Sequence, residues 1–435
     1  MSGTREAMRE FKGRVTASAP QDSSATCRAL LRAVVLGWML MLPACGHSAA
    51  LDPVVAKRIA RNPPLPPVPP DPTNLVADKP AAAALGHRIF FDPGFSASGT
   101  VSCATCHDPR HGFADTKTIA VGEGAGTRNS LSVLNAAHHR WFTWDGRADT
   151  LWAQALQPFE APNEMHSTRA AVVARVESND ELRRLYVQVF GPLPDKGAPD
   201  AEVDRAFANI GKAIAAYERK LVTGPSAYDT WWTRYARGDE HADVELSPAA
   251  RRGLDLFFGK ADCWQCHHGA NFTDGEFHMI GVPPAGGGAQ KDQGRYAVVE
   301  GVAKSPFNAG GPFSDDPKGA QSQISTRLAK NSSMWGQFRT PSLRAAVDTA
   351  PYMHQGQLPT LEAVVHFYNT LEGATALDHH RELVLRKLDL SAQEEADLVA
   401  FLKSLAGTPP EAPWNDAPED MRPQPSGRAA VKGAP

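Results

Sequence analysis

The stretch Cys103-Ala104-Thr105-Cys106-His107 sets the framework of this chain, and a second stretch of the same kind, Cys263-Trp264-Gln265-Cys266-His267, follows it 160 positions later. Each has the pattern Cys-x-x-Cys-His, in which two thiols form thioether bonds to a haem and the adjacent histidine ligates its iron. A redox dithiol would need only the cysteines, and a zinc site would need four ligands converging from both copies. Neither alternative accounts for a histidine after both pairs. We therefore expect two covalently bound c-type haems, attached through Cys103, Cys106, Cys263 and Cys266 and ligated by His107 and His267.

Length and composition set broad limits on the class of protein. A chain of 435 residues is long enough for two ordinary domains. Its 45 Lys and Arg residues nearly balance 48 Asp and Glu residues, so the net charge of −3 gives no reason to expect nucleic acid as a partner. The remaining two cysteines, Cys27 and Cys45, both precede the expected mature protein, so no structural disulfide is expected in it.

Residues 1–45 have the features of a secretory signal peptide. A polar region with several basic residues leads into an apolar run from Ala29 to Leu42, which is too short to span a bilayer permanently. In Leu42-Pro43-Ala44-Cys45, the cysteine resembles the lipidated residue of a bacterial lipoprotein, and the alternative is ordinary cleavage nearby. We expect export to the periplasm, where bacteria attach haem covalently, and treat a lipid anchor at Cys45 as a hypothesis.

The rest of the chain predicts a mainly α fold with two cytochrome c-like domains, each carrying one covalent haem. Apolar periodicity and capping residues predict helices at 80–91, 145–156, 168–178, 180–190, 200–221 and 248–258, and further ones starting at Thr360 and Ser391. Residues 283–333 are rich in Gly, Pro, Ser and Asn and predict a long loop over the second domain. No strand-rich region is evident.

The two halves are interpreted as diverged repeats, because helix 80–91 leads towards the first motif as helix 248–258 leads into the second. Seven prolines between Asn62 and Pro72 favour an extended spacer. The expected organisation is therefore a Pro-rich tether at 46–78, an N-terminal haem domain at 79–245, a C-terminal haem domain at 246–406 and a disordered tail at 407–435.

Several sequence blocks resemble the bacterial dihaem cytochrome c peroxidase and MauG family over roughly residues 80–405. In order they are Ser102–His107 with Phe113-Ala114-Asp115, Arg128-Asn129-Ser130, Trp144-Asp145-Gly146-Arg147-Ala148, Thr340-Pro341-Ser342-Leu343-Arg344 and Ala350-Pro351-Tyr352-Met353-His354. The resemblance implies an oxidoreductase that reduces hydrogen peroxide at the N-terminal haem. Electrons would pass through the C-terminal haem from a small redox protein, either a c-type cytochrome or a cupredoxin.

The resemblance also assigns roles to residues near the first haem. Gln154 and Glu164 match a pair that the family places over the peroxide-binding iron, with Pro158 between them. Peroxide cleavage needs a group that takes a proton from the inner oxygen and returns it to the outer one, and Glu164 is the candidate, with Gln154 orienting the peroxide. Taken alone, both would be read as solvated polar residues. Trp144 matches a tryptophan that carries electrons between the haems, although it could equally be a core aromatic.

A calcium ion between the haems is also implied, at Asn129, Thr349 and Pro351, whose oxygen atoms suit a hard cation. Where resting family members have a distal histidine, this chain has Gly122-Glu123-Gly124. Glu123 is a poor replacement ligand, so we expect the first haem to be five-coordinate or to hold only water. A ligand from His111, His138 or His139 is the alternative.

The second haem needs a further axial ligand, and Tyr368, fourteen residues after His354, is the candidate. A phenolate favours ferric iron whereas a thioether favours ferrous iron, so Tyr368 indicates a MauG-like arrangement. His366, Met279 and Met353 remain alternatives. Two other functions stay open: a MauG-like enzyme that oxidatively modifies a partner protein, and a dihaem electron carrier without peroxide chemistry. Gln154 and Glu164 argue against the carrier.

Overall fold

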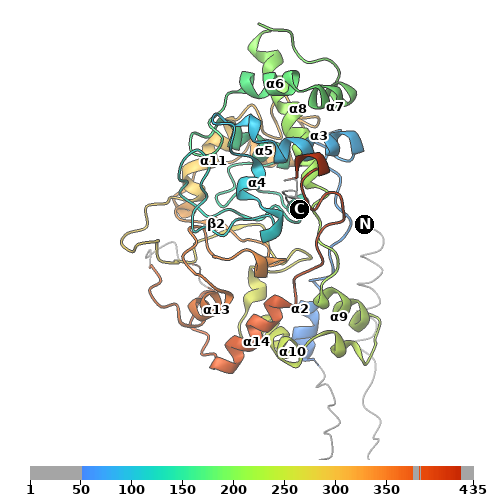
Figure 1. Ribbon diagram of the computed structural model, residues 1–435. Coiled ribbons are helices and arrows are strands. Elements are labelled where there is room, and N and C mark those ends of the chain that lie inside the picture. The colour runs from blue at the N-terminus through green and yellow to red at the C-terminus, as the bar shows by residue number, and fades with distance from the viewer. Residues whose placement is uncertain (1–50, 376–381, 383, 423–435) are drawn as a thin grey trace, which may run out of the picture.

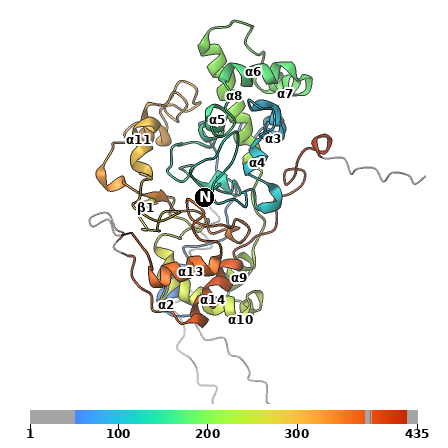
Figure 2. The same cartoon turned by 60° about the vertical axis from the view of Figure 1, so that its left-hand side comes forward.

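A computed structural model describes residues 51–375, 382 and 384–422, so the signal peptide, Cys45 and residues 423–435 lie outside the described part. The described chain is mainly helical, as predicted, and its named strands form one short antiparallel pair, β1 (Phe277–His278) with β2 (Phe338–Arg339). Figures 1 and 2 show two groups of helices, one above the other. The helices are α2 (Pro53–Ile59), α3 (Pro80–Phe91), α4 (Cys103–Cys106), α5 (Leu151–Glu160), α6 (Arg169–Ser178), α7 (Asp180–Phe190), α8 (Asp200–Glu218), α9 (Ala227–Ala236), α10 (Pro248–Phe258), α11 (Arg295–Lys304), α12 (Ala320–Ser325), α13 (Leu361–Thr370) and α14 (Ala392–Lys403).

The predicted helix starts are confirmed where a side-chain cap was visible in the sequence. Ser247 accepts a hydrogen bond from Ala250 N at the start of α10, and Thr360 accepts one from Ala363 N at the start of α13. Ser391 and Glu394 form the expected capping box on α14. The prediction for 145–156 is wrong in its bounds, because Thr150 caps the helix at Ala153 N and α5 continues to Glu160.

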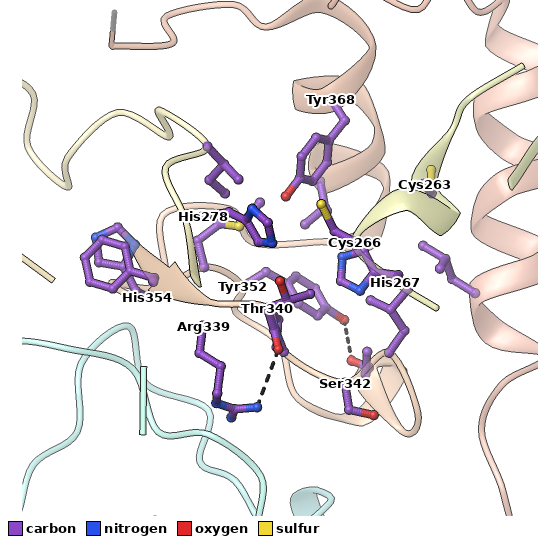
Figure 3. Close-up of a pocket in the computed structure, with 18 of the residues that line it drawn as sticks. Cys263, Cys266, His267, His278, Arg339, Thr340, Ser342, Tyr352, His354 and Tyr368 are labelled. Atoms are coloured by element: carbon purple, nitrogen blue, oxygen red, sulfur yellow. Dashed lines mark hydrogen bonds between the residues drawn. The ribbon is translucent and has the colours of Figure 1, made fainter. Parts of the chain in front are cut away.

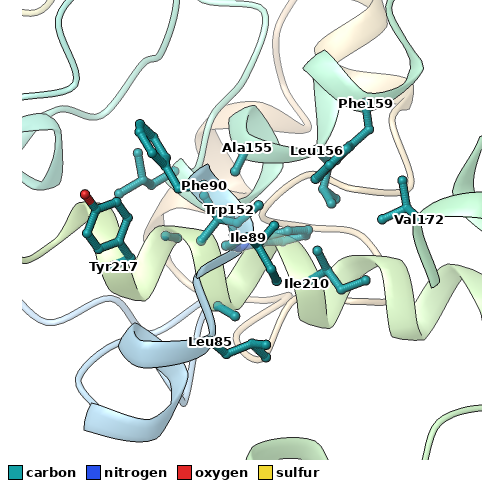
Figure 4. Packing of buried hydrophobic residues seen from close by; sticks show 14 of the residues in the cluster. Leu85, Ile89, Phe90, Trp152, Ala155, Leu156, Phe159, Val172, Ile210 and Tyr217 are labelled. Carbon is teal, nitrogen blue, oxygen red and sulfur yellow. The ribbon is translucent and has the colours of Figure 1, made fainter. Parts of the chain in front are cut away.

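The upper group of helices encloses the first hydrophobic core. α8 lies at its centre, and Phe207, Ile210, Ile214 and Tyr217 are buried on the face that their three- and four-residue spacing predicts. Trp152 and Phe159 of α5 pack into the same core, together with side chains of α3, α6 and α7 (Figure 4). The first motif borders this core, since Cys103 and Ala104 pack against it.

The lower group encloses a second core, built from α9, α10, α13 and α14. Phe257 and Phe401 are buried at its centre, and Cys263 and Trp264 of the second motif pack against it. Tyr228 and Trp231 of α9 also belong to this core, so the second core begins before the expected boundary at residue 246.

A glycine marks the main helix crossing in each half. A Cβ on Gly86 of α3 would overlap the carbonyl of Ala213 in α8, and a Cβ on Gly253 of α10 would overlap the carbonyl of Asp397 in α14. Neither glycine has a positive φ, so the requirement is space for two backbones in direct contact. The same crossing therefore precedes both motifs, which supports the interpretation of the halves as diverged repeats.

The expected tether is wrong for residues 51–78, because this segment packs on both halves. Val55 and Ile59 of α2 lie in the second core, and Asn62 is fully buried. Further along, the carbonyl of Pro69 accepts a hydrogen bond from Arg219 after α8. The prolines thus shape a segment that is held by distant parts of the chain.

The expected disordered tail is also wrong, for residues 407–422. Tyr217 donates its hydroxyl proton to the carbonyl of Trp414, and His87 of α3 bonds the carbonyl of Asp416. Trp414 packs against the first core. These residues form a strap over the N-terminal half, and in Figure 1 the segment after α14 runs up to α3 and α8.

The predicted loop at 283–333 contains α11 and α12 and packs on the first half rather than the second. Phe307 and Phe313 enter the first core, and Ala309 N donates to Asp149. Arg295 of α11 lies between the rings of Trp141 and Phe277, at 4.4 and 4.3 Å. Within the described residues, no helix is long and apolar enough to cross a membrane.

A Gly→Ala change inside a helix usually stabilises a protein, and the same change at either crossing glycine should destabilise it. Gly86→Ala and Gly253→Ala should each lower the free energy of unfolding by about 1–3 kcal/mol, because the new methyl group overlaps a backbone carbonyl. Gly301→Ala, in α11, is the control, because its Cβ would meet open space, and it should stabilise the protein by about 0.5–1 kcal/mol. Denaturant midpoints of the three variants test this, and equal midpoints would contradict the crossing argument.

Candidate functional site

The histidines of the two motifs are oriented in the same way. His107 Nδ1 bonds the carbonyl of Phe113 at 3.2 Å, and His267 Nδ1 bonds the carbonyl of Phe272 at 3.0 Å. This hydrogen bond fixes the ring and leaves Nε2 available as a metal ligand. Burial lowers the pKa of both imidazoles, which favours the neutral form that ligates iron. Both histidines therefore fit the proximal position of a c-type haem.

A large pocket of about 250 Å³ lies beside the second motif, and we call it the second-motif pocket. Cys263, Cys266 and His267 form one wall, and Tyr368 of α13 forms another (Figure 3). The segment containing Arg339, Thr340 and Ser342 completes it. The pocket thus joins the two thiols, the oriented imidazole and a candidate second ligand.

Arg339 gives an independent indication of what this pocket holds. Its side chain is buried, and its pKa is lowered to about 10 by that burial. Its nitrogens donate to the carbonyls of Thr143 and Thr340, at 3.2 and 3.4 Å, and among the described residues no carboxylate pairs with it. A buried cation without a counterion is costly. The carboxylate of a haem propionate would satisfy it, so the residues present fit the group.

Tyr368 is the best placed of the candidate ligands in this pocket. Burial raises the pKa of its hydroxyl, which Figure 3 shows pointing into the pocket near Cys266. His366 is more than half exposed and bonds Glu395, so it faces away. Met353 lines the pocket, whereas Met279 is buried and lines a separate cavity.

His278 was missed by the sequence analysis, although it lines the same pocket. It lies between two carboxylates, with Nε2 2.8 Å from Asp274 and Nδ1 2.9 Å from Glu382. Burial lowers its pKa, but these hydrogen bonds outweigh burial and raise it to about 12. His278 thus lies between two carboxylates near the second motif, and only the folded chain brings residue 382 back to residue 278.

Glu164 is joined to the first motif through residues 121–123, because Cys106 Sγ lies 3.9 Å from the carbonyl of Val121 and Glu123 bonds the backbone of Glu164. Burial raises the pKa of Glu164 itself, and Arg147, 3.8 Å away, opposes that shift. Arg147 is held by Gln157, which accepts its Nε hydrogen bond at 2.9 Å. A partly buried carboxyl group beside one cation is a suitable proton acceptor and donor.

The Gly122-Glu123-Gly124 stretch supports the backbone of Glu164. Glu123 N donates to the carbonyl of Glu164, at 2.8 Å, and a Cβ on Gly122 would overlap that carbonyl. The carboxylate of Glu123 accepts a hydrogen bond from Ser98 N at 2.9 Å. This explains why glycine precedes Glu123, and the carboxylate of Glu123 is occupied by its bond to Ser98.

Gln154 and Pro158 lie four residues apart on α5, so they share one face of the helix. Both are partly exposed, whereas Trp152, Ala155 and Phe159 of the same helix are buried in the core. The structure therefore presents Gln154 and Pro158 away from the core, on the helix that leads into Glu164.

Trp144 lines the second-motif pocket and is held from several sides. Its indole N–H donates to the carbonyl of Asn129 at 2.9 Å, and its own carbonyl accepts from Arg339 N at 2.7 Å. The neighbouring Asp145 pairs with Arg128, which also binds Asp292 at 2.7 Å. Trp144 is thus a fixed ring on the wall between the halves.

Asn129, Thr349 and Pro351 all line the second-motif pocket, although Asn129 is far from the other two in sequence. The backbone of Asn129 donates to the carbonyl of His354 at 2.8 Å, which joins the two segments. The group offers an amide side chain and backbone carbonyls, a donor set that suits calcium.

Comparisons with known proteins agree with this geometry. The model of the di-haem cytochrome c peroxidase family matches residues 80–240. The methylamine utilization protein MauG of Methylorubrum extorquens is 38% identical over 76% of this chain and 79% of its own length. The cytochrome-c peroxidase IdrP1 of Denitromonas iodatirespirans is 35% identical over 81% of this chain and 88% of its own. A solved MauG-like protein associated with microbial copper homeostasis superposes with a TM-score of 0.62 at 28% identity, covering 81% of this chain and 98% of that one.

Removing the charge of Arg147 should raise the pKa of Glu164 further, because a nearby cation favours the ionised carboxylate. We expect this in Arg147→Gln, with the infrared carboxyl band of Glu164 persisting to higher pH than in the parent protein. Subtracting spectra of the corresponding Glu164→Gln proteins isolates the band. Arg140→Gln, which removes an exposed arginine paired with Glu276, should leave the titration unchanged. A downward shift in Arg147→Gln would contradict the assignment.

Proposed function

The chain belongs to the di-haem cytochrome c peroxidase and MauG family of oxidoreductases, and from this premise we propose that it reduces hydrogen peroxide at a haem held by Cys103, Cys106 and His107. A second haem, held by Cys263, Cys266 and His267, would receive electrons from a small redox protein, a c-type cytochrome or a cupredoxin. The observation that carries the proposal is Glu164, a partly buried carboxyl group beside one arginine, whose backbone is held by the same segment that contacts Cys106.

The haem supplies an iron that binds peroxide and exchanges electrons with it, and the protein supplies the proton transfer. Reduction of peroxide to two waters consumes two electrons and two protons, and one proton must move from the inner to the outer oxygen. Glu164 would accept and return that proton. Burial raises the pKa of Glu164, so the carboxyl group can hold the proton that it accepts. The charge of Arg147 keeps the group ionisable. Gln154 and Pro158 would orient the peroxide and shape the space beside it.

Electrons would reach the first haem through Trp144. The ring is fixed by hydrogen bonds at both its indole nitrogen and its backbone carbonyl, which keeps its position constant. We further propose that Tyr368 is the second axial ligand of the C-terminal haem, supported by its orientation into the second-motif pocket. A calcium ion at Asn129, Thr349 and Pro351 would stiffen the wall on which Trp144 lies.

A MauG-like activity, in which the oxidised enzyme modifies a residue of a partner protein, is the second candidate. The position of Tyr368 favours it, because a phenolate ligand lowers the haem potential and makes highly oxidised states easier to reach. Steady turnover with a reduced cytochrome would indicate the scavenging role, and its absence despite a single-turnover reaction would indicate the modifying role. Both roles fit an exported protein of the periplasm.

Glu164→Gln tests the main proposal. The variant keeps the shape of the side chain but cannot shuttle a proton, so the rate constant for the reaction of the ferric protein with peroxide should fall by about 10²–10⁴-fold. Stopped-flow absorbance measures this rate. Glu160→Gln is the matched control, since Glu160 ends α5 and its exposed side chain pairs with Arg169. An unchanged rate in Glu164→Gln would remove the proposed proton transfer, and a parent protein inert to peroxide even after partial reduction would leave an electron carrier.

Tyr368→Phe should change the optical and spin-resonance spectrum of the low-spin haem, because it removes the proposed ligand oxygen. Tyr352→Phe is the control: Tyr352 lines the same pocket, but its hydroxyl donates to the carbonyl of Ala346 at 3.0 Å. The low-spin signal of this control should match the parent. Identical spectra for parent and Tyr368→Phe would show that another group ligates the iron.

A further inference from the structure

Three oxidisable rings of α9 form a continuous stack, and we call Tyr228, Trp231 and Tyr235 the α9 ladder. The ring centroids of Tyr228 and Trp231 are 5.8 Å apart, and those of Trp231 and Tyr235 are 5.0 Å apart with the planes only 10° from parallel. Spacings of three and four residues place the rings on one helix face. Tyrosine and tryptophan are the side chains that most readily lose an electron without breaking.

The inner end of the ladder lies against the residue that orients the second haem's histidine. The ring of Tyr228 meets that of Phe272 edge to face at 5.1 Å, and the carbonyl of Phe272 accepts the hydrogen bond from His267 Nδ1. A buried ion pair holds α9 in place here, with Arg344 bound to both oxygens of Asp229 at 2.8 and 2.9 Å. The ladder thus begins beside the second haem site on a rigid helix.

The middle ring carries a feature that favours loss of an electron. The indole N–H of Trp231 donates to a carboxylate oxygen of Asp243 at 2.8 Å, and Trp231 is fully buried. A carboxylate bonded to the indole stabilises the positive charge that forms when the ring is oxidised. Arg251, 3.2 Å from the same oxygen, reduces this effect without removing it. If Trp231 served only to pack the core, a neutral acceptor would satisfy its indole N–H equally well.

The outer end of the ladder reaches the surface. Tyr235 is partly exposed, near the end of α9, and the segment that follows it includes the exposed residues Gly238 and Glu240. Figures 1 and 2 show α9 at the periphery of the lower helix group. The neighbouring Trp232 points elsewhere, since its indole donates to the carbonyl of Ile59 in α2.

We propose that the α9 ladder carries single electrons from a reducing partner that docks over Tyr235 to the second haem. The inference rests on the proposed function, because it names where that donor delivers its electrons. In each passage the donor loses one electron and the second haem gains one. The oxidant is the enzyme that has reacted with peroxide, which takes the electron from the ladder. Tyr235 then releases its phenol proton to water when oxidised and recovers it when the donor reduces it, while the proton of Trp231 stays shared with Asp243. Two passages supply the electrons that one peroxide consumes.

The test is a flash experiment on the dihaem protein without peroxide, so its outcome is independent of peroxidase activity. A ruthenium photo-oxidant is attached to a cysteine at Glu240→Cys, and the second haem is reduced beforehand. After the flash, absorbance follows oxidation of that haem. Trp231→Phe should slow this oxidation by about tenfold or more, because phenylalanine replaces the oxidisable indole. A tenfold slowing corresponds to about 1.4 kcal/mol of added barrier. Tyr235→Phe should also slow it, and this change removes only a hydroxyl group from a ring that packs against the second core.

Trp232→Phe is the matched control on the same helix, and its rate should equal the parent's. Equal rates in Trp231→Phe, Tyr235→Phe and Trp232→Phe would overturn the ladder. An unchanged optical spectrum of the second haem in each variant shows that the slowing does not come from a disturbed haem site. Loss of peroxide reduction in the parent would overturn the proposed function alone, because the flash rates do not depend on it.

Discussion

Direct contact between two helix backbones, made once in each half, is the constraint on which the structure depends. Gly86 and Gly253 let α3 meet α8 and α10 meet α14 without an intervening side chain. A motif with a Cys-x-x-Cys-His pattern follows each crossing, and the histidine of each is oriented by a carbonyl a few residues later. Because the crossing fixes the helix that precedes each motif, it also fixes where the imidazole can point. The rest of the site is built around these two rings.

The two halves then differ in the charges placed around their motifs. The first has Glu164, a carboxyl group whose pKa is raised by burial and restrained by one arginine, which suits a proton that must move. The second has His278 between Asp274 and Glu382, and its hydrogen bonds raise its pKa. The first motif therefore has a carboxyl group nearby, and the second has an imidazole held by two carboxylates. This difference is one reason for proposing peroxide chemistry at the first haem and electron transfer at the second.

The parts of the fold that could be predicted from sequence depend on local chemistry. The two motifs, the caps at Ser247 and Ser391 and the buried face of α8 each involve residues a few positions apart. The errors concern segments whose structure is set by distant partners. The prolines between residues 62 and 72 favour a spacer in the sequence. The hydrogen bond from Arg219 to the carbonyl of Pro69 holds this segment in place, but it leaves no signal in the local sequence. For the site, Gln154, Glu164 and Tyr368 are candidates that come from family resemblance, whereas the pairing of Arg147 with Gln157 and of His278 with Glu382 required the folded chain.

The two ends of the described chain are exchanged between the halves: α2 packs on the second core, and the strap at 407–422 packs on the first. A chain that folds from its N-terminus onwards therefore cannot complete its first half until residue 414 is present. Until then, the first core lacks the cover that Trp414 provides beside His87 and Tyr217. Cutting the protein between its halves would leave two incomplete pieces, so maturation, turnover and degradation should each involve the whole molecule as one unit.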